Sequence, residues 1–358
     1  MLYYLLYTLH IKFSVFNVFR YITFRTVLAI LSALVLSFFL TPFMIRKFNE
    51  WKIKSDKRED LPDRHIEKKG TPTMGGFVIL VSTIIPTLLW SDLKNPYVWI
   101  VTFVLLSFGG IGFMDDIKKL KNERGKGVPG RTKLIFQIFF TLVVGALLYM
   151  KGGFITGLTV PFFKNITPDL GIFYILLCVL IVVGTSNGVN LTDGLDGLAI
   201  GPVLTVCSTF ILFAYLAGNV KFAQYLQIFY VKGAGELAIL CGAMLGAGIG
   251  FLWYNTYPAE LFMGDTGSLS LGAGLAVIAI IIKQEILLII AGGIFVIETL
   301  SVIIQVLSFK WRGKRVFRMA PIHHHFELKG WNEGKIVVRF WIISFILALL
   351  ALSTLKLR

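Results

Sequence analysis

The stretch YVWIVTFVLLSFGGIGFMDD, residues 97–116, decides the fold class of this 358-residue chain. Residues 97–114 carry no charge, and about 20 apolar residues in an α-helix span the hydrocarbon core of a membrane. A transmembrane β-strand would be shorter and would alternate apolar with polar residues. The stretch therefore predicts a membrane-spanning helix that ends in two adjacent carboxylates, Asp115 and Asp116.

Similar apolar runs recur along the whole chain. The composition is 56% hydrophobic and 15% charged, with a mean hydropathy of +0.77, whereas a soluble chain is about a quarter charged. No internal repeat or soluble domain is visible, so residues 1–358 are predicted to form one all-α polytopic membrane domain. The ten expected transmembrane helices lie near residues 24–45, 74–90, 97–114, 134–150, 171–189, 198–217, 235–254, 267–282, 286–308 and 336–355.

Two segments outside these runs have their own character. Residues 1–20 lack the basic start and the small-residue cleavage site of a signal peptide, and they are rich in Tyr and Phe. We expect them to form an N-terminal interfacial helix, because aromatic side chains favour the headgroup zone. Residues 151–170 combine Thr, Val and Phe with Gly and Pro, which predicts a small external β-hairpin.

The basic residues indicate an orientation in the membrane. The alternate loops 46–72, 115–133 and 309–335 carry 23 of the 35 Lys and Arg residues. Loops rich in Lys and Arg lie on the cytoplasmic side of a membrane protein. We therefore expect these loops in the cytoplasm and both termini outside.

The polar signatures gather on five loops of the predicted cytoplasmic face. Ionisable groups at the edge of a membrane span are costly and usually functional. The five segments are EKKGTPTMGG (67–76), MDDIKKLK (114–121), NGVNLTDGLDGLA (187–199), NTYPAELFMGDTGSLSLG (255–272) and APIHHHFE (320–327).

Carboxylates in these loops predict a magnesium site. Hard oxygen ligands suit Mg²⁺, which usually combines one or two carboxylates with substrate phosphates and water. The aspartates at boundaries between an apolar run and a loop are Asp115, Asp116, Asp193, Asp196 and Asp265. The basic residues that we expect to hold phosphate oxygens are Lys68, Lys69, Lys119, Lys121 and Lys133.

Residues 264–268, GDTGS, resemble a phosphate-binding turn. Gly264 and Gly267 leave backbone amides accessible, and Ser268 opens the next apolar helix, whose N-terminus attracts anions. The Gly-Lys-Ser/Thr ending of a Walker A motif is missing. A simple helix cap is the alternative interpretation of this turn.

Other kinds of site are less well supported. Three consecutive histidines, 323–325, cannot all reach one metal ion from a helix, so contacts to phosphate or sugar are favoured over zinc. No G-x-S-x-G nucleophile elbow is present, and the three cysteines lie inside apolar runs. The role of Glu298, inside the ninth expected span, is left open between a packing hydrogen bond and function. The pattern as a whole predicts Mg²⁺-assisted phosphoryl transfer at the cytoplasmic membrane surface.

Four motifs resemble the bacterial phospho-N-acetylmuramoyl-pentapeptide-transferase family, the lipid I synthases of peptidoglycan assembly, and the resemblance covers essentially the whole chain. They are GTPTMGG (70–76), NLTDGLDGLA (190–199), FMGDTGSLSLG (262–272) and APIHHHFE (320–327). The resemblance implies Mg²⁺-dependent transfer of the phospho-sugar of UDP-N-acetylmuramoyl-pentapeptide to undecaprenyl phosphate, giving lipid I and UMP. It further implies a homodimer in the bacterial inner (cytoplasmic) membrane, a groove along the ninth span for the prenyl chain, and no nucleic-acid partner.

The resemblance also implies roles for individual residues. Asp265 is the expected main Mg²⁺ ligand, and Asp115 and Asp116 are expected to act on the lipid phosphate or the metal. Whether Asp115 is a general base or a positioning residue stays open, as do the separate roles of His323 and His324. The expected nucleotide-sugar site comprises Lys68, Asn190, Asp193, Asp196, Asn255 and Phe262; the expected phosphate contacts are Lys119, Lys133, Gly264 and Ser268.

Two alternatives remain in view. An enzyme of the same fold that transfers N-acetylglucosamine-1-phosphate to a polyprenyl phosphate is the nearer one, although TPTMGG (71–76) and APIHHHFE (320–327) favour the first assignment. A transporter is the remote alternative. Transporters usually hold their polar groups near the membrane midplane, between two related halves, whereas here the polar motifs share one face.

Overall fold

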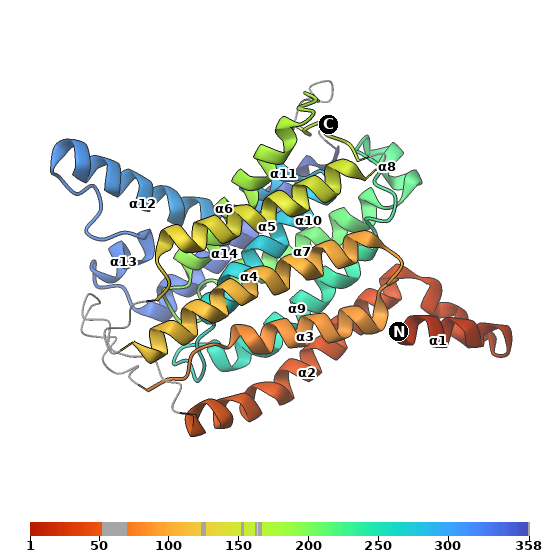
Figure 1. Cartoon of the computed structure of the whole chain (residues 1–358), viewed down its shortest axis with the longest axis horizontal. Coiled ribbons are helices and arrows are strands. Elements are labelled where there is room, and N and C mark those ends of the chain that lie inside the picture. The colour runs from red at the N-terminus through yellow and green to blue at the C-terminus, as the bar shows by residue number, and fades with distance from the viewer. Residues whose placement is uncertain (52–69, 123–126, 152–153, 162, 164–166, 357–358) are drawn as a thin grey trace.

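The computed structural model describes residues 1–51, 70–122, 127–151, 154–161, 163 and 167–356, and within them the chain is predominantly helical (Figure 1). Nine helices of this part are long and apolar enough to cross a membrane. The prediction of an all-α polytopic membrane protein is thereby confirmed. The nine are α2 (Ile22–Glu50), α4 (Pro96–Lys121), α5 (Gly130–Met150), α6 (Phe173–Thr192), α7 (Ile200–Ala217), α9 (Glu236–Asn255), α10 (Gly264–Ile281), α12 (Gly293–Arg312) and α14 (Glu333–Ser353).

The remaining expected span, residues 74–90, forms a shorter helix. Helix α3 (Gly76–Trp90) has 15 residues, and at about 1.5 Å per residue it covers about 22 Å, less than the roughly 30 Å of a hydrocarbon core. The count of ten spans therefore stays a prediction. The expected ninth span, 286–308, is divided at Gly292 into α11 (Glu285–Ala291) and α12, because the backbone of Gly292 leaves the helical conformation.

Helix α10 lies at the centre of the bundle, between α4, α6 and α3 (Figure 1). Nearly all of its side chains are buried, which explains why its sequence is apolar around the whole helix. Glycines allow its close contacts: a Cβ atom on Gly76 would collide with the backbone of Gly267, and one on Gly112 with the backbone of Asp265. Small residues at helix crossings are the usual means of close packing in membranes.

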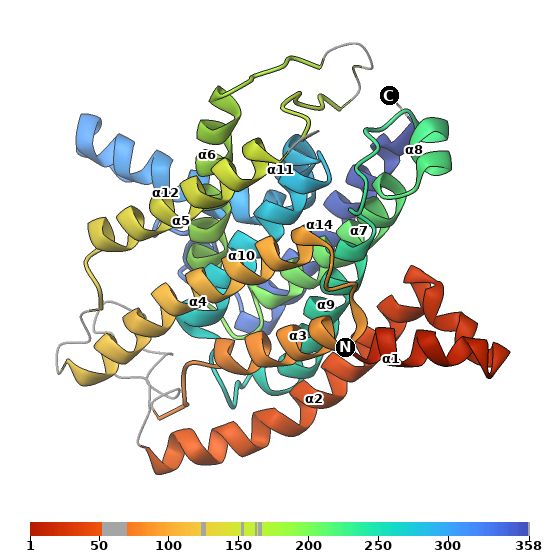
Figure 2. The ribbon, with the colours of Figure 1, turned by 45° about the vertical axis from the view of Figure 1, so that its right-hand side comes forward.

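The two ends of the bundle differ. Helices α12 and α13 (Ile322–Glu327) extend from one end, whereas α1 (Leu2–Thr8) and α8 (Val220–Leu226) lie at the other (Figure 1). Figure 2 shows α12 again on the side away from α1 and α8. The N-terminal helix expected within residues 1–20 is present as α1, but it is shorter than this segment. The segment instead folds as α1 followed by two 3₁₀ helices, Leu9–Ile11 and Ser14–Arg20, because Phe13 adopts an extended backbone and interrupts the helix.

The expected hairpin over residues 151–170 is only partly described. Gly157 and Asp169 form an antiparallel bridge, flanked by hydrogen bonds from Leu158 N–H to the Pro168 carbonyl (3.0 Å) and from Leu170 N–H to the Thr156 carbonyl (3.3 Å). Residues 152–153, 162 and 164–166 lie outside the described part. The hairpin stays a prediction.

Candidate active site

Three aspartates from two distant parts of the sequence meet at the buried end of α4 and the start of α10. Ligand atoms of Asp115, Asp116 and Asp265 all lie within 4.8 Å of one another, and all three side chains are buried. Asp115 and Asp116 come from the last turns of α4, and Asp265 comes from the first turn of α10. Three carboxylates this close repel one another unless cations or hydrogen-bond donors compensate their charge.

Two lysines compensate Asp115 and Asp265. The Lys119 Nζ atom lies 2.6 Å from Oδ2 of Asp115 and 2.8 Å from Oδ1 of Asp265. The Lys133 Nζ atom lies 3.1 Å from Oδ2 of Asp115 and 2.7 Å from Oδ2 of Asp265. Each ammonium therefore bridges the same two carboxylates. This is the arrangement that a divalent cation with oxygen ligands would also favour.

Asp116 is compensated differently. Its Oδ1 atom accepts the backbone N–H of Asp265 (3.2 Å), and its Oδ2 atom accepts the backbone N–H (3.0 Å) and the hydroxyl of Thr266 (2.7 Å). The carboxylate thus caps the N-terminus of α10, where free N–H groups and the helix dipole favour an anion. Gly264, with a positive φ of 72°, gives the turn room, since a Cβ atom there would press on Asp116.

Besides the two lysines, a backbone amide also holds the Asp115 carboxylate in place. Its Oδ1 atom accepts the backbone N–H of Val128 at 2.6 Å, and the side chain is completely buried. A Cβ atom on Gly127 would collide with this carboxylate. Gly127 and Val128 therefore lie directly against Asp115, and the sequence permits this because Gly127 has no side chain.

In the turn at residues 264–268, groups that were expected to bind phosphate already have hydrogen-bond partners within the protein. The amides of Asp265 and Thr266 donate to Asp116, while the Ser268 hydroxyl donates to the Gly264 carbonyl (3.0 Å) and accepts from Nδ2 of Asn190 (2.9 Å). A phosphate at this turn would have to displace the Asp116 carboxylate. Phosphate contacts by Gly264 and Ser268 stay a prediction.

The expected nucleotide-sugar residues that the structure describes lie at the same end of the bundle. Asn255 joins two loops: its Oδ1 accepts the N–H of Gly197 (3.1 Å), and its Nδ2 donates to the Leu261 carbonyl (2.8 Å). Asp196 accepts the N–H of Ala259 at 3.0 Å. Asp196 and Asn255 are buried and thus shape the loops. The backbone carbonyl of Phe262 accepts the N–H of Gly75 at 2.8 Å.

Of the other expected contacts, Asp193 and Phe262 are each half-buried. Lys68 lies outside the described residues, as does its neighbour Lys69. Lys121 lies in the last turn of α4, and no ion pair within the described chain joins it to the three aspartates. The described geometry therefore brings Asp115, Asp116, Asp265, Lys119 and Lys133 into one cluster.

The histidine motif folds as the short helix α13 and meets α12. Nδ1 of His323 lies 3.1 Å from Oε1 of Glu298, and both side chains are fully buried. Nδ1 of His324 lies 2.6 Å from Oε2 of Glu327. Both imidazoles are therefore oriented by carboxylates, which is how proteins fix the tautomer of a functional histidine.

His325 differs from its two neighbours. Its Nδ1 accepts the backbone N–H of Arg318 at 3.1 Å. Partial burial, together with the Lys329 and Arg318 cations, lowers the pKa of His325 below its usual range. The uncharged imidazole is therefore favoured at this position.

The contact between Glu298 and His323 was not predictable from the sequence. The two residues lie 25 positions apart, and no periodic pattern connects them. The only signal was a carboxylate inside an apolar run, which is costly unless it has a partner. Gly194 in the NLTDGLDGLA motif completes the pairing, because a Cβ atom there would collide with Nε2 of His323.

A groove runs along α6, from Glu285 near the opposite end of the bundle to Leu300 on α12. It has a volume of about 220 Å³ and lies between α6 on one side and α11 and α12 on the other. Its lining is mostly apolar and includes Gly184, Leu288, Phe295 and Val296. It follows the divided ninth span, along which the family resemblance implies a groove for the prenyl chain.

Known proteins similar to this chain share its full length. Residues 98–283 match the model of glycosyl transferase family 4. A phospho-N-acetylmuramoyl-pentapeptide-transferase of Syntrophus aciditrophicus (strain SB) is 60% identical over 359 aligned positions, covering 100% of both chains. Proteins of the same name from Pelobacter propionicus and Citrifermentans bemidjiense are 58% and 57% identical, again over 100% of both chains.

Proposed function

The chain belongs to the phospho-N-acetylmuramoyl-pentapeptide-transferase family, and from this premise we propose how its residues carry out the reaction. The enzyme is a phosphoglycosyl transferase of peptidoglycan synthesis. It transfers phospho-N-acetylmuramoyl-pentapeptide from its UDP conjugate to undecaprenyl phosphate, forming lipid I and UMP. An oxygen of the lipid phosphate attacks the phosphorus that carries the sugar, and the bond from that phosphorus to the UMP oxygen breaks.

One observation carries the proposed site: the convergence of Asp115, Asp116 and Asp265 within 4.8 Å of one another, between the Lys119 and Lys133 cations. Three carboxylates supply the hard oxygen donors that Mg²⁺ prefers. We assign Asp265 as the main ligand, with Asp115 beside it. When bound there, the cation would neutralise negative charge on the diphosphate as UMP leaves.

The protein residues have separate tasks in this proposal. Lys119 and Lys133 turn from the carboxylates to the substrate phosphates, since ammonium groups bind phosphate oxygens readily. Asp116 holds the start of α10, and with it Asp265, in place through its contacts to Thr266. Phosphoryl transfer asks the protein chiefly for such positioning and charge compensation.

Asp115 acts as a positioning residue in this proposal. Its Oδ1 accepts the Val128 amide and its Oδ2 contacts both lysines. When the lysines move to the substrate phosphates, Oδ2 faces the proposed metal position, so the carboxylate holds a cation rather than a proton from the lipid phosphate. The same contacts support direct attack by the lipid phosphate over a covalent intermediate on Asp115.

In this proposal, the loops and helices around the aspartate cluster form the sites for the nucleotide-sugar and for the lipid. The loops that Asp196 and Asn255 shape, with Asn190, Asp193, Phe262 and Lys68, hold the UDP-sugar. His324 contacts its phosphate or sugar groups, and the fully buried His323 supports His324, with the two ring centroids 4.1 Å apart. The groove between α6 and α12 holds the start of the prenyl chain. A homodimer in the bacterial cytoplasmic membrane, with the site on the cytoplasmic side, completes the proposal.

The test uses purified protein with UDP-N-acetylmuramoyl-pentapeptide, undecaprenyl phosphate and Mg²⁺, and it measures UMP release. Release should need both substrates and should not occur with UDP-N-acetylglucosamine. Asp265→Asn should lower turnover at least about a hundredfold while the protein stays folded in the membrane. Glu50→Gln, at an exposed carboxylate, is the matched control. Near-normal turnover of Asp265→Asn at ordinary Mg²⁺ would contradict the assignment.

A further inference from the structure

A second pocket lies at the opposite end of the helices that form the active site. It has a volume of about 560 Å³ and is lined by the start of α4, the residues after α5, the loop before α9 and the loop after α10. Helix α4 joins the two sites, and at about 1.5 Å per residue it separates Tyr97 from Asp116 by about 28 Å. This distance matches the thickness of a bilayer core, so the pocket lies at the other membrane interface.

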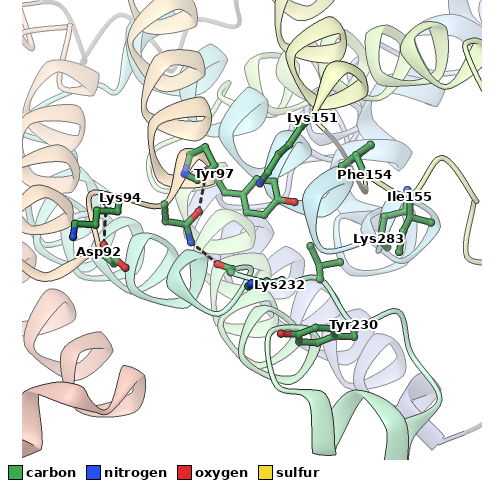
Figure 3. Close-up of a pocket in the computed structure, with 13 residues that line it drawn as sticks. Asp92, Lys94, Tyr97, Lys151, Phe154, Ile155, Tyr230, Lys232 and Lys283 are labelled. Atoms are coloured by element: carbon green, nitrogen blue, oxygen red, sulfur yellow. Dashed lines mark hydrogen bonds between the residues drawn. The ribbon is translucent and has the colours of Figure 1, made fainter.

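Lysines dominate the charge of this pocket. Lys94, Lys151, Lys232 and Lys283 line it, together with a single carboxylate, Asp92 (Figure 3). Asp92 accepts hydrogen bonds from the Tyr4 hydroxyl and from the Lys94 backbone amide. These two contacts partly satisfy its carboxylate, and four lysines share the lining with this one acidic side chain.

Only one of the four lysines has a close anionic partner. Lys283 is fully buried and lies 2.8 Å from Oε1 of Glu285, with the Tyr174 hydroxyl at 2.6 Å. The other three have no carboxylate within ion-pair distance among the described residues. Lys151 instead places its ammonium group 3.3 Å from the centre of the Tyr97 ring (Figure 3). The pocket therefore carries an excess of positive charge.

Burial makes this excess costly. It lowers the pKa of Lys151, and it lowers the pKa of Lys283 despite the opposing effect of Glu285. Both directions show that the charged ammonium groups lack full compensation in the protein alone. An anion in the pocket would supply the missing compensation.

Apart from Asn95, the remainder of the lining is mostly apolar or aromatic. Phe154, Ile155, Tyr230 and the Tyr97 ring contribute to it. A site for a freely diffusing anion needs no such surface, whereas a lipid brings apolar carbons beside its charged headgroup. Aromatic residues with lysines at an interface are typical of protein surfaces that contact lipid headgroups.

We propose that this pocket binds the phosphate group of an anionic phospholipid from the membrane leaflet opposite the active site. Lys151 and Lys232 contact the phosphate oxygens. The buried Lys283 attracts the phosphate through its positive charge without contacting it. The aromatic lining contacts the glycerol and the first acyl carbons. The proposal is independent of the catalytic assignment, because none of these residues takes part in the transfer reaction.

The experiment measures lipid binding by the full-length protein with native mass spectrometry. The detergent-solubilised protein is titrated with phosphatidylglycerol, and separately with zwitterionic phosphatidylcholine of the same chain length. We expect preferential binding of phosphatidylglycerol, reduced about tenfold in Lys151→Gln/Lys232→Gln, since each basic residue near a membrane surface contributes measurably to the attraction of anionic lipid. Thermal unfolding without lipid verifies that this double variant is folded.

The matched control is Lys12→Gln/Lys221→Gln, which removes two exposed lysines outside the pocket. It should bind phosphatidylglycerol like the unmodified protein. Equal losses in both double variants would show a general charge effect and overturn the pocket. If inorganic phosphate displaced phosphatidylglycerol at equal concentration, the lipid assignment would be overturned in favour of a free anion.

Discussion

Nδ1 of His323 lies 3.1 Å from the carboxylate of Glu298, and neither side chain is accessible to solvent. This contact joins α12, which borders the apolar groove, to α13, which carries the histidine motif. A buried carboxylate of this kind fixes the tautomer and the ring orientation of its histidine. We infer that Glu298 positions His323 rather than contacting a substrate.

Glu298 variants test this positioning role. Glu298→Gln keeps an oxygen acceptor for Nδ1, whereas Glu298→Ala leaves the imidazole unsupported. We expect kcat to fall about a hundredfold in the alanine variant and about tenfold or less in the glutamine variant. Steady-state kinetics with thermal unfolding of both variants measures this. Equal kcat values for the two variants would contradict the positioning role.

Lys133 should compete with the divalent cation. Its ammonium bridges Asp115 and Asp265, so Lys133→Met removes a positive charge from the proposed metal position. The Mg²⁺ concentration that gives half-maximal turnover should fall several-fold, because fewer cations oppose the metal, while the maximal rate falls at least about tenfold. Lys118→Met, at an exposed lysine in the last turn of α4, should change neither value. An unchanged or higher Mg²⁺ requirement in Lys133→Met would show that the amine does not compete.

The pH profile of Asp115→Asn separates positioning from base catalysis. A phosphate monoester has a second pKa of about 6, so above that pH the lipid phosphate needs no base. If Asp115 positions the site, the deficit of Asp115→Asn should stay constant from about pH 6 to 9 in single-turnover reactions. A deficit that shrinks steadily as the pH rises would instead identify Asp115 as the base.

Gly184 tests the groove for the prenyl chain. A Cβ atom on Gly184 would meet nothing within 4 Å, so the leucine of Gly184→Leu can enter the groove without disturbing the helix. We expect the KM for undecaprenyl phosphate to rise about tenfold and the KM for the UDP-sugar to stay unchanged, because the leucine occupies apolar space only. Gly110→Leu, at an equally open position on α4, is the control. The same KM for the lipid in both variants would place the prenyl chain elsewhere.

The membrane orientation can be tested by cysteine labelling. Cys178, Cys207 and Cys241 are all buried, so they should not react in the folded protein. A cysteine at Lys314, beyond α12, should react only with reagents that enter the cytoplasm, whereas one at Lys221, on α8, should react in intact spheroplasts. Labelling of Lys314→Cys by an impermeant reagent in intact spheroplasts would reverse the orientation.

The sequence by itself determined the all-α membrane fold, because a run such as residues 97–114 is stable across a bilayer only as a helix that satisfies its own backbone hydrogen bonds. It also determined the family, through motifs that stay contiguous along the chain. It overestimated the length of the helix at residues 1–20, since local aromatic content does not reveal where Phe13 interrupts it.

Only the tertiary structure decided how the site residues divide their tasks. Asp115 and Asp116 are neighbours in sequence, yet one contacts Lys119 and Lys133 while the other caps α10. The sequence could not distinguish them, because the difference depends on how closely α4 approaches α10 at Gly112. The same holds for Glu298 and His323, and for the lysine pocket at the far end of α4: each joins side chains from separate helices. Helix formation follows from local apolar content, whereas the distances between helices follow from packing.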